Sequence, residues 1–296
     1  MTLLDKAMSI VARKVDEEMG RLLPALTDLP ESRLIEAMRY TALVPAKRLR
    51  PFLVMASADL FEVAQDHALR VAAAVELVHA YSLVHDDLPC MDDDDLRRGQ
   101  PTVHIKFDEA TAVLTGDALL TLAFEVLAEP ATHPSAEVRL ELIRGLSRAA
   151  GPAGMVGGQA IDLAADKAQF DIGAITRLQN LKTGALIAFS CEAGAILGHS
   201  DPTRRHALRA YAHDIGLAFQ ITDDLLDIEG SREETGKAVG KDDAANKATL
   251  VKLLGLDQAR TQARMLASQA AVHLEPFGPK ASLLRDLAEF VVSRRK

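Results

Sequence analysis

The sequence predicts an all-α protein folded as a single large helical bundle. Apolar residues recur at helical spacing along the whole chain, and no segment shows the alternation typical of strands. Aromatic residues make up only 4% of the chain and Trp is absent, so the apolar content is mostly Ala, Leu, Val and Ile. Small aliphatic side chains favour closely packed helices, and 296 residues suffice to bury a substantial core.

Most predicted helices are apolar-periodic stretches bounded by proline or glycine. The predicted helices cover residues 3–23, 31–43, 47–64, 66–88, 108–128, 135–150, 174–198, 203–229, 244–254, 256–274 and 280–294. The predicted breaks are Pro24, Pro30, Pro45, Pro89, Pro101, Pro130, Pro134, the GPAGMVGG stretch from Gly151, Pro202, the segment 230–240 and the FGP at Phe277. No connector is long or polar enough to be a domain linker, so residues 1–296 are expected to form one domain.

Two of these helices are apolar on nearly every side, TAVLTGDALLTLAFEVLA from Thr111 and TGALIAFSCEAGAILG from Thr183. Such helices belong in the interior of a bundle. An Ala- and Leu-rich interior is explained as core, and it would also suit an apolar tunnel.

Composition and charge exclude several classes of protein. The net charge of -8 argues against nucleic-acid or anionic-membrane partners, since no broad basic surface is expected. Cys90 and Cys191 are too far apart to suggest a disulfide framework or a metal site. The N-terminal segment has charges within its apolar positions, unlike a signal peptide, and no apolar run is expected to be long enough to span a bilayer. We therefore expect a cytoplasmic protein without stable membrane insertion.

The segment HDDLPCMDDDD, which begins at His85, concentrates negative charge. Six aspartates fall within ten residues, and each pair at ~5 Å repels by roughly 3 kcal/mol at an effective dielectric constant of ~20. Pro89 prevents regular continuation of the helix, so the loop can fold Asp92 back beside Asp86. Bound cations would offset both the repulsion and the unfavourable helix dipole at this C-terminal end.

A second acidic cluster, FQITDDLLD, begins at Phe219. On a helix Asp223 and Asp227 lie about 40° apart, with Gln220 on the same stripe. An acidic helix face exposed to solvent is an equally good explanation of this cluster taken alone.

Oxygen ligands without His or Cys favour a hard cation, and Mg²⁺ typically combines one or two carboxylates with substrate phosphates. The spacing does not fit an EF-hand, and zinc would require His or Cys. Mg²⁺ bound to a phosphorylated ligand is therefore the expected cofactor chemistry.

Cationic residues that could bind phosphate occur in compact groups. These are Lys47, Arg48 and Arg50 in AKRLRP, Arg97 with Arg98, Lys182, and Lys237, Lys241 and Lys247. Each group alone is ordinary surface charge, but together with two aspartate motifs they indicate a diphosphate site. His79 lies two helical turns before Asp86 on the same face and can line the same cavity.

These motifs resemble the head-to-tail trans-isoprenyl diphosphate synthases, most closely the bacterial farnesyl diphosphate synthases. AKRLRP, VELVHAYSLVHDDLPCMDDDDLRRGQPT, GDALLTLAFEVL, GMVGGQAIDL, LKTGALI, FQITDDLLD and GKD follow in the family's order over nearly the whole chain. The resemblance implies the isoprenoid synthase bundle with a central active-site cavity, and a homodimer.

The resemblance also implies a role for each candidate residue. Several Mg²⁺ ions, with Mn²⁺ as a substitute, would be held by Asp86, Asp87, Asp92, Asp223, Asp224 and Asp227. Isopentenyl diphosphate would be bound by Lys47, Arg50, His79 and Arg98, and the allylic diphosphate by Arg97, Lys182 and Lys237, with Lys247 as a further contact. Thr183 and Gln220 would orient dipoles toward the carbocation and join Lys182 as the catalytic side chains. Gln159 and Asp162 match supporting positions, while Asp93, Asp94, Asp95, Arg294, Arg295 and Lys296 have no assigned role.

Product length in the family depends on residues just before the first motif. Tyr81 lies five residues, or about 7.5 Å along a helix, before Asp86, where a bulky ring would close the tunnel at fifteen carbons. Ser82 is its neighbour in the chain-length region. A farnesyl product is expected, with geranyl or geranylgeranyl diphosphate as alternatives.

Two positions depart from the family. Pro45 and Ala46 replace the usual Gly-Gly before KRLRP, and the late Gly-Lys-[Ser/Thr] reads Asn246-Lys247-Ala248-Thr249. Neither departure touches the aspartates.

Other classes explain less of the sequence. A His-Asp metal phosphohydrolase could use His79, His85 and Asp86 but leaves Asp223–Asp227 unexplained. A non-catalytic helical subunit would usually have lost one of the motifs, and a terpene cyclase would not need a second diphosphate site at Lys47, Arg50 and His79.

Overall fold

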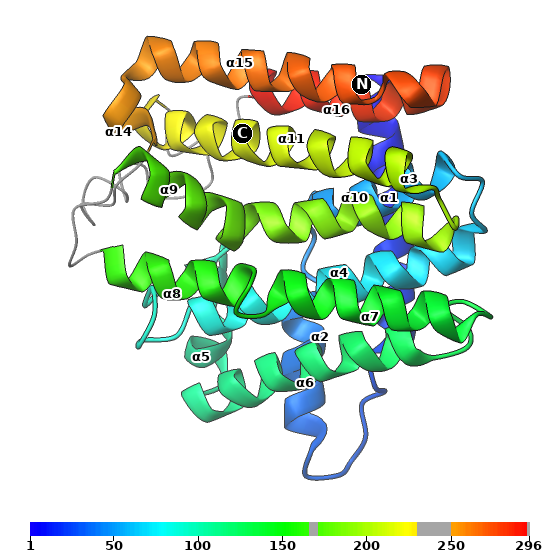
Figure 1. Ribbon diagram of the computed structural model, residues 1–296. Coiled ribbons are helices and arrows are strands. Elements are labelled where there is room, and N and C mark those ends of the chain that lie inside the picture. The colour runs from blue at the N-terminus through cyan, green and yellow to red at the C-terminus, as the bar shows by residue number, and fades with distance from the viewer. Residues whose placement is uncertain (166–170, 230–249, 295–296) are drawn as a thin grey trace.

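The computed structural model describes residues 1–165, 171–229 and 250–294, and it confirms the all-α fold (Figure 1). Its long helices are α1 (Leu3–Leu22), α2 (Ser32–Ala42), α3 (Leu49–Asp59), α4 (Gln65–Asp86), α6 (Glu109–Ala128), α7 (Ala136–Ala150), α8 (Met155–Ala165), α10 (Ala185–Leu197), α11 (Pro202–Glu229), α15 (Leu256–His273) and α16 (Ser282–Ser293). Shorter elements are α5 (Val103–Lys106), α9 (Ile172–Gln179), α14 (Leu250–Leu254) and the strands β1 (Leu96–Arg97) and β2 (Gln100–Pro101). The first part of the predicted helix 244–254 lies outside the described residues.

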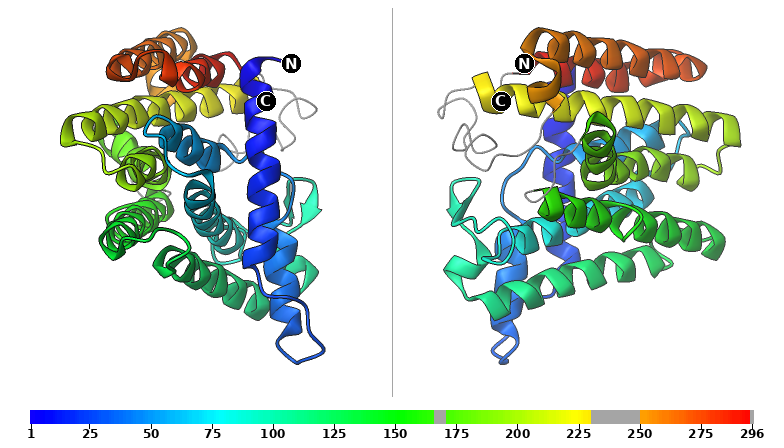
Figure 2. Two further views of the ribbon diagram at one scale, coloured as in Figure 1. Left: turned by 90° about the vertical axis from the view of Figure 1, so that its right-hand side faces the viewer. Right: turned by 60° about the vertical axis from the view of Figure 1, so that its left-hand side comes forward.

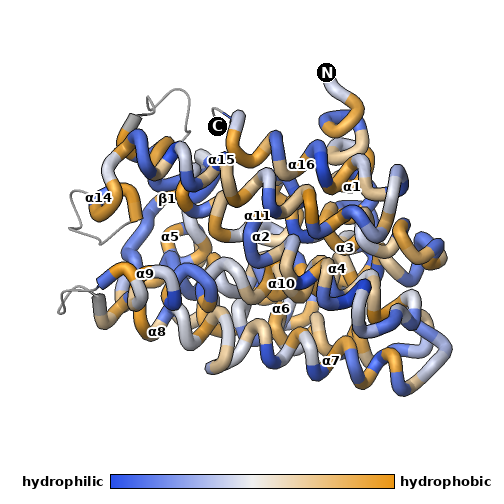
Figure 3. Tube along the Cα trace, turned by 45° about the horizontal axis from the view of Figure 1, so that its top comes forward, coloured by the Kyte–Doolittle hydropathy of each residue, from blue (hydrophilic) through white to orange (hydrophobic). Residues whose placement is uncertain are grey.

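Helix α4 is the centre of the bundle. It packs against α1, α3, α6 and α10, and in the left view of Figure 2 it lies between α1 and the row of helices opposite. Every residue from Val71 to Val78 is buried, as expected of a helix surrounded by others. One apolar cluster surrounds α4, and a second joins α3, α10, α11, α15 and α16. The outer helices α7 and α15 alternate polar and apolar residues along their length (Figure 3).

The predicted helix 174–198 is continuous but changes its winding at the middle. Helix α9 runs into a π-helical turn over Asn180–Gly184, and α10 follows directly. Single π-helical turns occur frequently at functional sites. This turn carries two of the expected catalytic residues, Lys182 and Thr183.

The segment LRRGQP after the acidic loop forms a small hairpin that the sequence analysis did not predict. Leu96 pairs with Pro101 and Arg97 with Gln100, which leaves Arg98 and Gly99 as a two-residue turn. Both turn residues have positive φ, 53° and 76°, as a type I′ turn requires. The turn therefore fixes the backbone of Arg98 beside the acidic loop.

The predicted break at GPAGMVGG was wrong in its second half, because α8 begins at Met155. Its glycines allow close packing: a Cβ added at Gly158 would lie 2.2 Å from the backbone nitrogen of Lys182. The glycine pattern therefore marks the contact between α8 and the π-helical turn, not a loop.

The expectation that no apolar run could span a bilayer was also wrong by the measures of length and composition. Helix α6 has 20 residues and a mean hydropathy of 1.5 over its most apolar window. It packs against α2, α4, α5 and α7, and 44% of that window is buried, so the helix predicted for the interior is only partly covered.

Replacing Gly158 with Ala should destabilise the protein by roughly 1–3 kcal/mol, because the methyl group would force α8 away from the π-helical turn. Thermal unfolding measures the loss. Gly20→Ala is the matched control, since Gly20 lies in a helix with no atom within 4 Å of an added Cβ. Equal stability of the two variants would contradict the close contact.

Candidate active site

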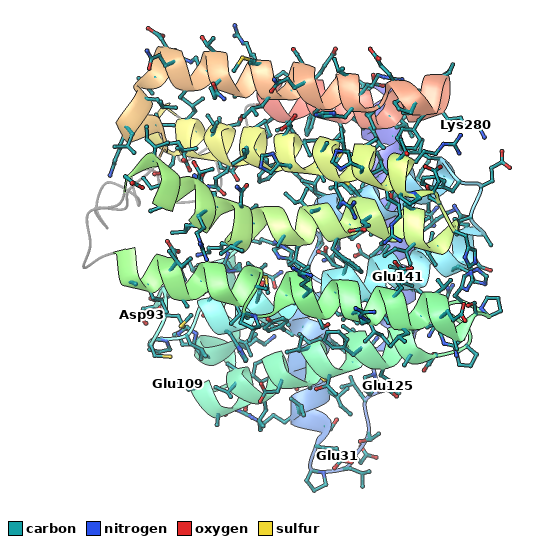
Figure 4. The ribbon with its side chains drawn as sticks, viewed as in Figure 1. Glu31, Asp93, Glu109, Glu125, Glu141 and Lys280 are labelled. Atoms are coloured by element: carbon teal, nitrogen blue, oxygen red, sulfur yellow. The ribbon has the colours of Figure 1, made fainter. Side chains whose placement is uncertain are left out.

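The two aspartate motifs lie at the C-terminal ends of α4 and α11. Both ends point to the side of the bundle where α8 and α9 lie, and Figure 4 shows Asp93 of the acidic loop on that side. Residues far apart in the sequence therefore meet there.

The acidic loop folds back as predicted. The backbone N–H of Asp92 donates to the carbonyl oxygen of Asp86 at 2.9 Å, and that of Asp94 donates to Asp87 O at 3.2 Å. Helix α4 ends at Asp86, three residues before Pro89. The backbone contact confirms that the interrupted helix brings the two ends of the first motif together.

Asp87 is the buried member of the first motif, with 3% exposure. The Nε of Arg97 donates to its Oδ1 at 2.6 Å, which joins the start of the hairpin to the end of α4. Burial raises the pKa of Asp87, and the bond from Arg97 opposes that rise. Arg97, an expected diphosphate contact, thus also offsets the negative charge of Asp87, an expected metal ligand.

A series of side-chain contacts leads from the first motif to α8 and the π-helical turn. The amide of Gln159 donates to Asp86 Oδ1. One turn further along α8, Asp162 accepts a bond from Lys182 Nζ at 2.5 Å. The expected supporting residues Gln159 and Asp162 therefore contact one aspartate and one expected catalytic residue.

The series continues into the second motif. The hydroxyl of Thr183 donates to Gln220 Oε1 at 3.3 Å, and the amide of Gln220 donates to Asp224 Oδ1 at 2.9 Å. Asp224 is 4% exposed and also accepts a 3.4 Å bond from Gln179 Nε2. The contacts of α8 and those of α11 thus reach the consecutive residues Lys182 and Thr183 of the π-helical turn.

Asp223 contacts the C-terminal segment. Arg294, whose role was left open above, donates to Asp223 Oδ1 at 2.7 Å, and its guanidinium stacks on the Phe219 ring at 3.9 Å. Asp227 is half-buried on the same helix. Arg295 and Lys296 lie outside the described residues.

A second group of expected site residues lines a cavity between α2, α4 and the hairpin. Its walls include His79, Arg97 and Arg98, with Tyr40 and Gln100 at the edge. Arg50 Nη1 lies 3.4 Å from His79 Nε2 and so adjoins the cavity. Burial, together with the neighbouring positive charge of Arg50, holds the pKa of His79 well below its usual range. A neutral imidazole among guanidinium groups gives the cavity a cationic wall.

The ligand chemistry of the aspartates fits Mg²⁺, because oxygen donors from Asp86, Asp92 and Asp223 are hard ligands. Within residues 1–165, 171–229 and 250–294, no three His, Cys, Asp or Glu side chains are grouped closely enough to hold a metal ion by themselves. Substrate phosphate oxygens and waters typically complete such Mg²⁺ sites.

The remaining expected residues have diverse positions. Lys47 is exposed, Ser82 donates to the carbonyl oxygen of His79 at 2.8 Å, and Tyr81 is buried in the apolar cluster around α4. Lys237 and Lys247 lie outside the described residues.

Sequence reasoning missed three residues of this region. Gln179 was not singled out because an isolated helical glutamine gives no signal; only its contact with Asp224 reveals it. Glu76 reads as one charge in an apolar helix, and a charge at a buried helical position was a signal that could have found it. Arg48 was grouped with the phosphate-binding cations, but it is buried and bonded to Glu76 at 2.7 Å.

Fold and site together define a helical protein with two aspartate motifs at helix C-terminal ends and a cationic cavity beside them. Residues 31–275 match the family model of polyprenyl synthetases, and the chain belongs to that family. It is 45% identical to the farnesyl diphosphate synthase of Escherichia coli over 96% of both chains, and 44% identical to that of Haemophilus influenzae over 96% of this chain and 97% of the other.

Solved structures agree with this assignment. A crystal structure described as an FPP/GFPP synthase from Zymomonas mobilis shares 52% sequence identity with a TM-score of 0.90, covering 98% of this chain and 99% of the other. The geranyltransferase of Legionella pneumophila is 33% identical with a TM-score of 0.87, covering 98% and 96% of the two chains. The chain is accordingly a prenyltransferase.

The lowered pKa of His79 predicts a pH-dependent loss of stability. Unfolding lets this imidazole protonate near its ordinary pKa of ~6.5, so the folded state should lose about 1 kcal/mol between pH 7 and pH 5.5 through this residue. Above that range the contribution is constant. In His79→Gln the pH dependence of denaturant unfolding should be weaker by that amount, whereas exposed His206→Gln should leave it unchanged. Equal slopes for wild type and His79→Gln would show that the buried imidazole protonates normally.

Proposed function

We propose that the chain condenses isopentenyl diphosphate with dimethylallyl and then geranyl diphosphate, head to tail and trans, to give farnesyl diphosphate. The observation that carries the proposal is that α8, which contacts Asp86, and α11, which carries Asp224, bond to the consecutive residues Lys182 and Thr183, beside a cationic cavity. A condensation of two prenyl diphosphates needs a binding site for each diphosphate group. The farnesyl diphosphate synthases among the relatives support the choice of reaction.

In the proposed reaction the aspartate side binds the allylic diphosphate. Lys182 and Arg97 would bind its oxygens and stabilise the charge that develops as the C–O bond breaks. When bound by Asp86, Asp87, Asp92, Asp223, Asp224 and Asp227, Mg²⁺ ions would supply further neutralisation of that diphosphate. Loss of diphosphate leaves an allylic carbocation.

The second substrate supplies the nucleophile. Lys47, Arg50, His79 and Arg98 would hold isopentenyl diphosphate with its double bond facing the cation. The carbonyl and hydroxyl dipoles near Thr183 and Gln220 would favour positive charge there. Attack by the double bond forms the new C–C bond, and loss of a proton to the released diphosphate restores an alkene. No side-chain nucleophile is required.

Incubation of the purified protein with isopentenyl diphosphate and either allylic diphosphate, with and without Mg²⁺, tests the proposal. Mass analysis should identify a C15 product only when the metal is present. Chain growth that persists in excess chelator would count against the metal role of the aspartates. Phosphate release without chain growth would instead favour a phosphohydrolase.

Tyr81 is proposed to limit the product to fifteen carbons. It is 6% exposed and packs edge-on against His85, with 5.8 Å between ring centroids, inside the apolar cluster around α4. The relatives include geranylgeranyl and geranylfarnesyl diphosphate synthases at 42% identity, so product length differs among relatives that are about equally similar to this chain.

Tyr81→Ala should therefore shift the product to C20 or longer, because removing the ring opens space below the acidic motif. Tyr81→Phe retains the ring and should still yield C15. Mass analysis of the products from both variants gives the comparison. A C15 product from Tyr81→Ala would move the stop to other residues.

We further propose that residues 1–296 form a single domain, and that two copies of the chain associate as a cytoplasmic homodimer. Helix α6 supports a partner, because Val113 and Leu114 on its outer side are 42% and 55% exposed. A solution mass of twice 31.9 kDa would support the dimer.

A further inference from the structure

Arg48 is a buried arginine whose guanidinium contacts four other residues of the chain. It precedes α3 with left-handed backbone angles, φ 48° and ψ 46°, which are unfavourable for a residue with a side chain. Its guanidinium donates to the carbonyl oxygens of Ala42 and Val44 at 2.7 and 3.0 Å, and it contacts Asp16 Oδ1 at 2.7 Å. Its fourth partner is Glu76 Oε1 at 2.7 Å.

Glu76 is a buried carboxylate next to the cationic cavity. It is 3% exposed, lies one turn before His79 on α4, and lines the cavity with Arg98. Burial lowers the pKa of both Arg50 and Arg98, and the negative charge of Glu76 is the largest effect that opposes this lowering. Glu76 is therefore the anion that Arg50 and Arg98 sense most strongly.

We propose that Arg48 is a positioning residue for the isopentenyl diphosphate site: it binds Glu76 and thereby keeps Arg50 and Arg98 for the substrate. This inference rests on the proposed function. A buried carboxylate without a partner is strongly unfavourable, so Glu76 without Arg48 would take the nearest guanidinium. Arg50 or Arg98 would then bind Glu76 and compete with binding of the diphosphate.

Steady-state kinetics on the full chain test the proposal, with each substrate varied at saturation of the other. Arg48→Met should raise KM for isopentenyl diphosphate by about tenfold and leave KM for geranyl diphosphate nearly unchanged, as expected for loss of a charge-assisted contact. Arg48→Lys keeps a cation beside Glu76, so its KM for isopentenyl diphosphate should stay close to that of wild type.

The double variant Arg48→Met with Glu76→Gln separates positioning from simple bracing. It lacks the buried Glu76 carboxylate that would capture Arg50 or Arg98, and the Asp16 carboxylate that remains is 34% exposed and therefore solvated. Its KM for isopentenyl diphosphate should return to within about threefold of wild type even if it is less stable. If Arg48 only braced the backbone, the double variant would keep the raised KM of Arg48→Met, because both variants lack the ion pair between Arg48 and Glu76. Equal KM values for the single and double variants would overturn the proposal.

Two further variants complete the design. Arg70 lies on the same helix α4 and forms an ion pair with Glu129, the residue after α6. Arg70→Met should lower stability without a selective change in either KM. If Arg48→Met does not fold, Glu76→Gln is compared with the double variant: a higher KM for isopentenyl diphosphate in the double variant contradicts the proposal. A wild-type protein that makes no prenyl product would refute the proposed function itself.

Discussion

The rest of the site depends on the gathering of carboxylates at the C-terminal ends of α4 and α11, where the helix dipoles also oppose negative charge. The surrounding residues answer that repulsion with donors. Arg97 bonds to Asp87, Gln159 to Asp86, Gln220 and Gln179 to Asp224, and Arg294 to Asp223. These donors keep the aspartates in place, and they are the groups that metal ions and diphosphates would meet.

The bundle lets these donors approach. Helix α4 is buried along its middle, so its end is fixed from several sides, and Gly158 lets α8 pack against the backbone of Lys182. The π-helical turn then directs Lys182 to Asp162 and Thr183 to Gln220 in successive positions. Irregular helix geometry and glycine contacts thus serve one purpose, which is to connect the two motifs.

The two sides of the site differ in how they treat charge. On the aspartate side, carboxylates from the ends of α4 and α11 gather together, which suits metal ions and the diphosphate that leaves. On the other side Arg50, Arg98 and a neutral His79 form a cationic wall, and the buried carboxylate of Glu76 beside them is paired with Arg48. This asymmetry is consistent with an ionising substrate on one side and a diphosphate that stays intact on the other.

The sequence by itself determined the helical class, the ends of most helices and the two aspartate motifs, because periodicity, proline positions and charge clusters are local features. Pro89 even predicted the return of Asp92 to Asp86. Tertiary structure alone decided that Arg48 pairs with Glu76, that α8 is a helix, and that Gln179 and Arg294 contact aspartates. Those outcomes depend on contacts between residues 28 to 71 positions apart, or on a backbone approach that only glycine allows, and local patterns do not encode either.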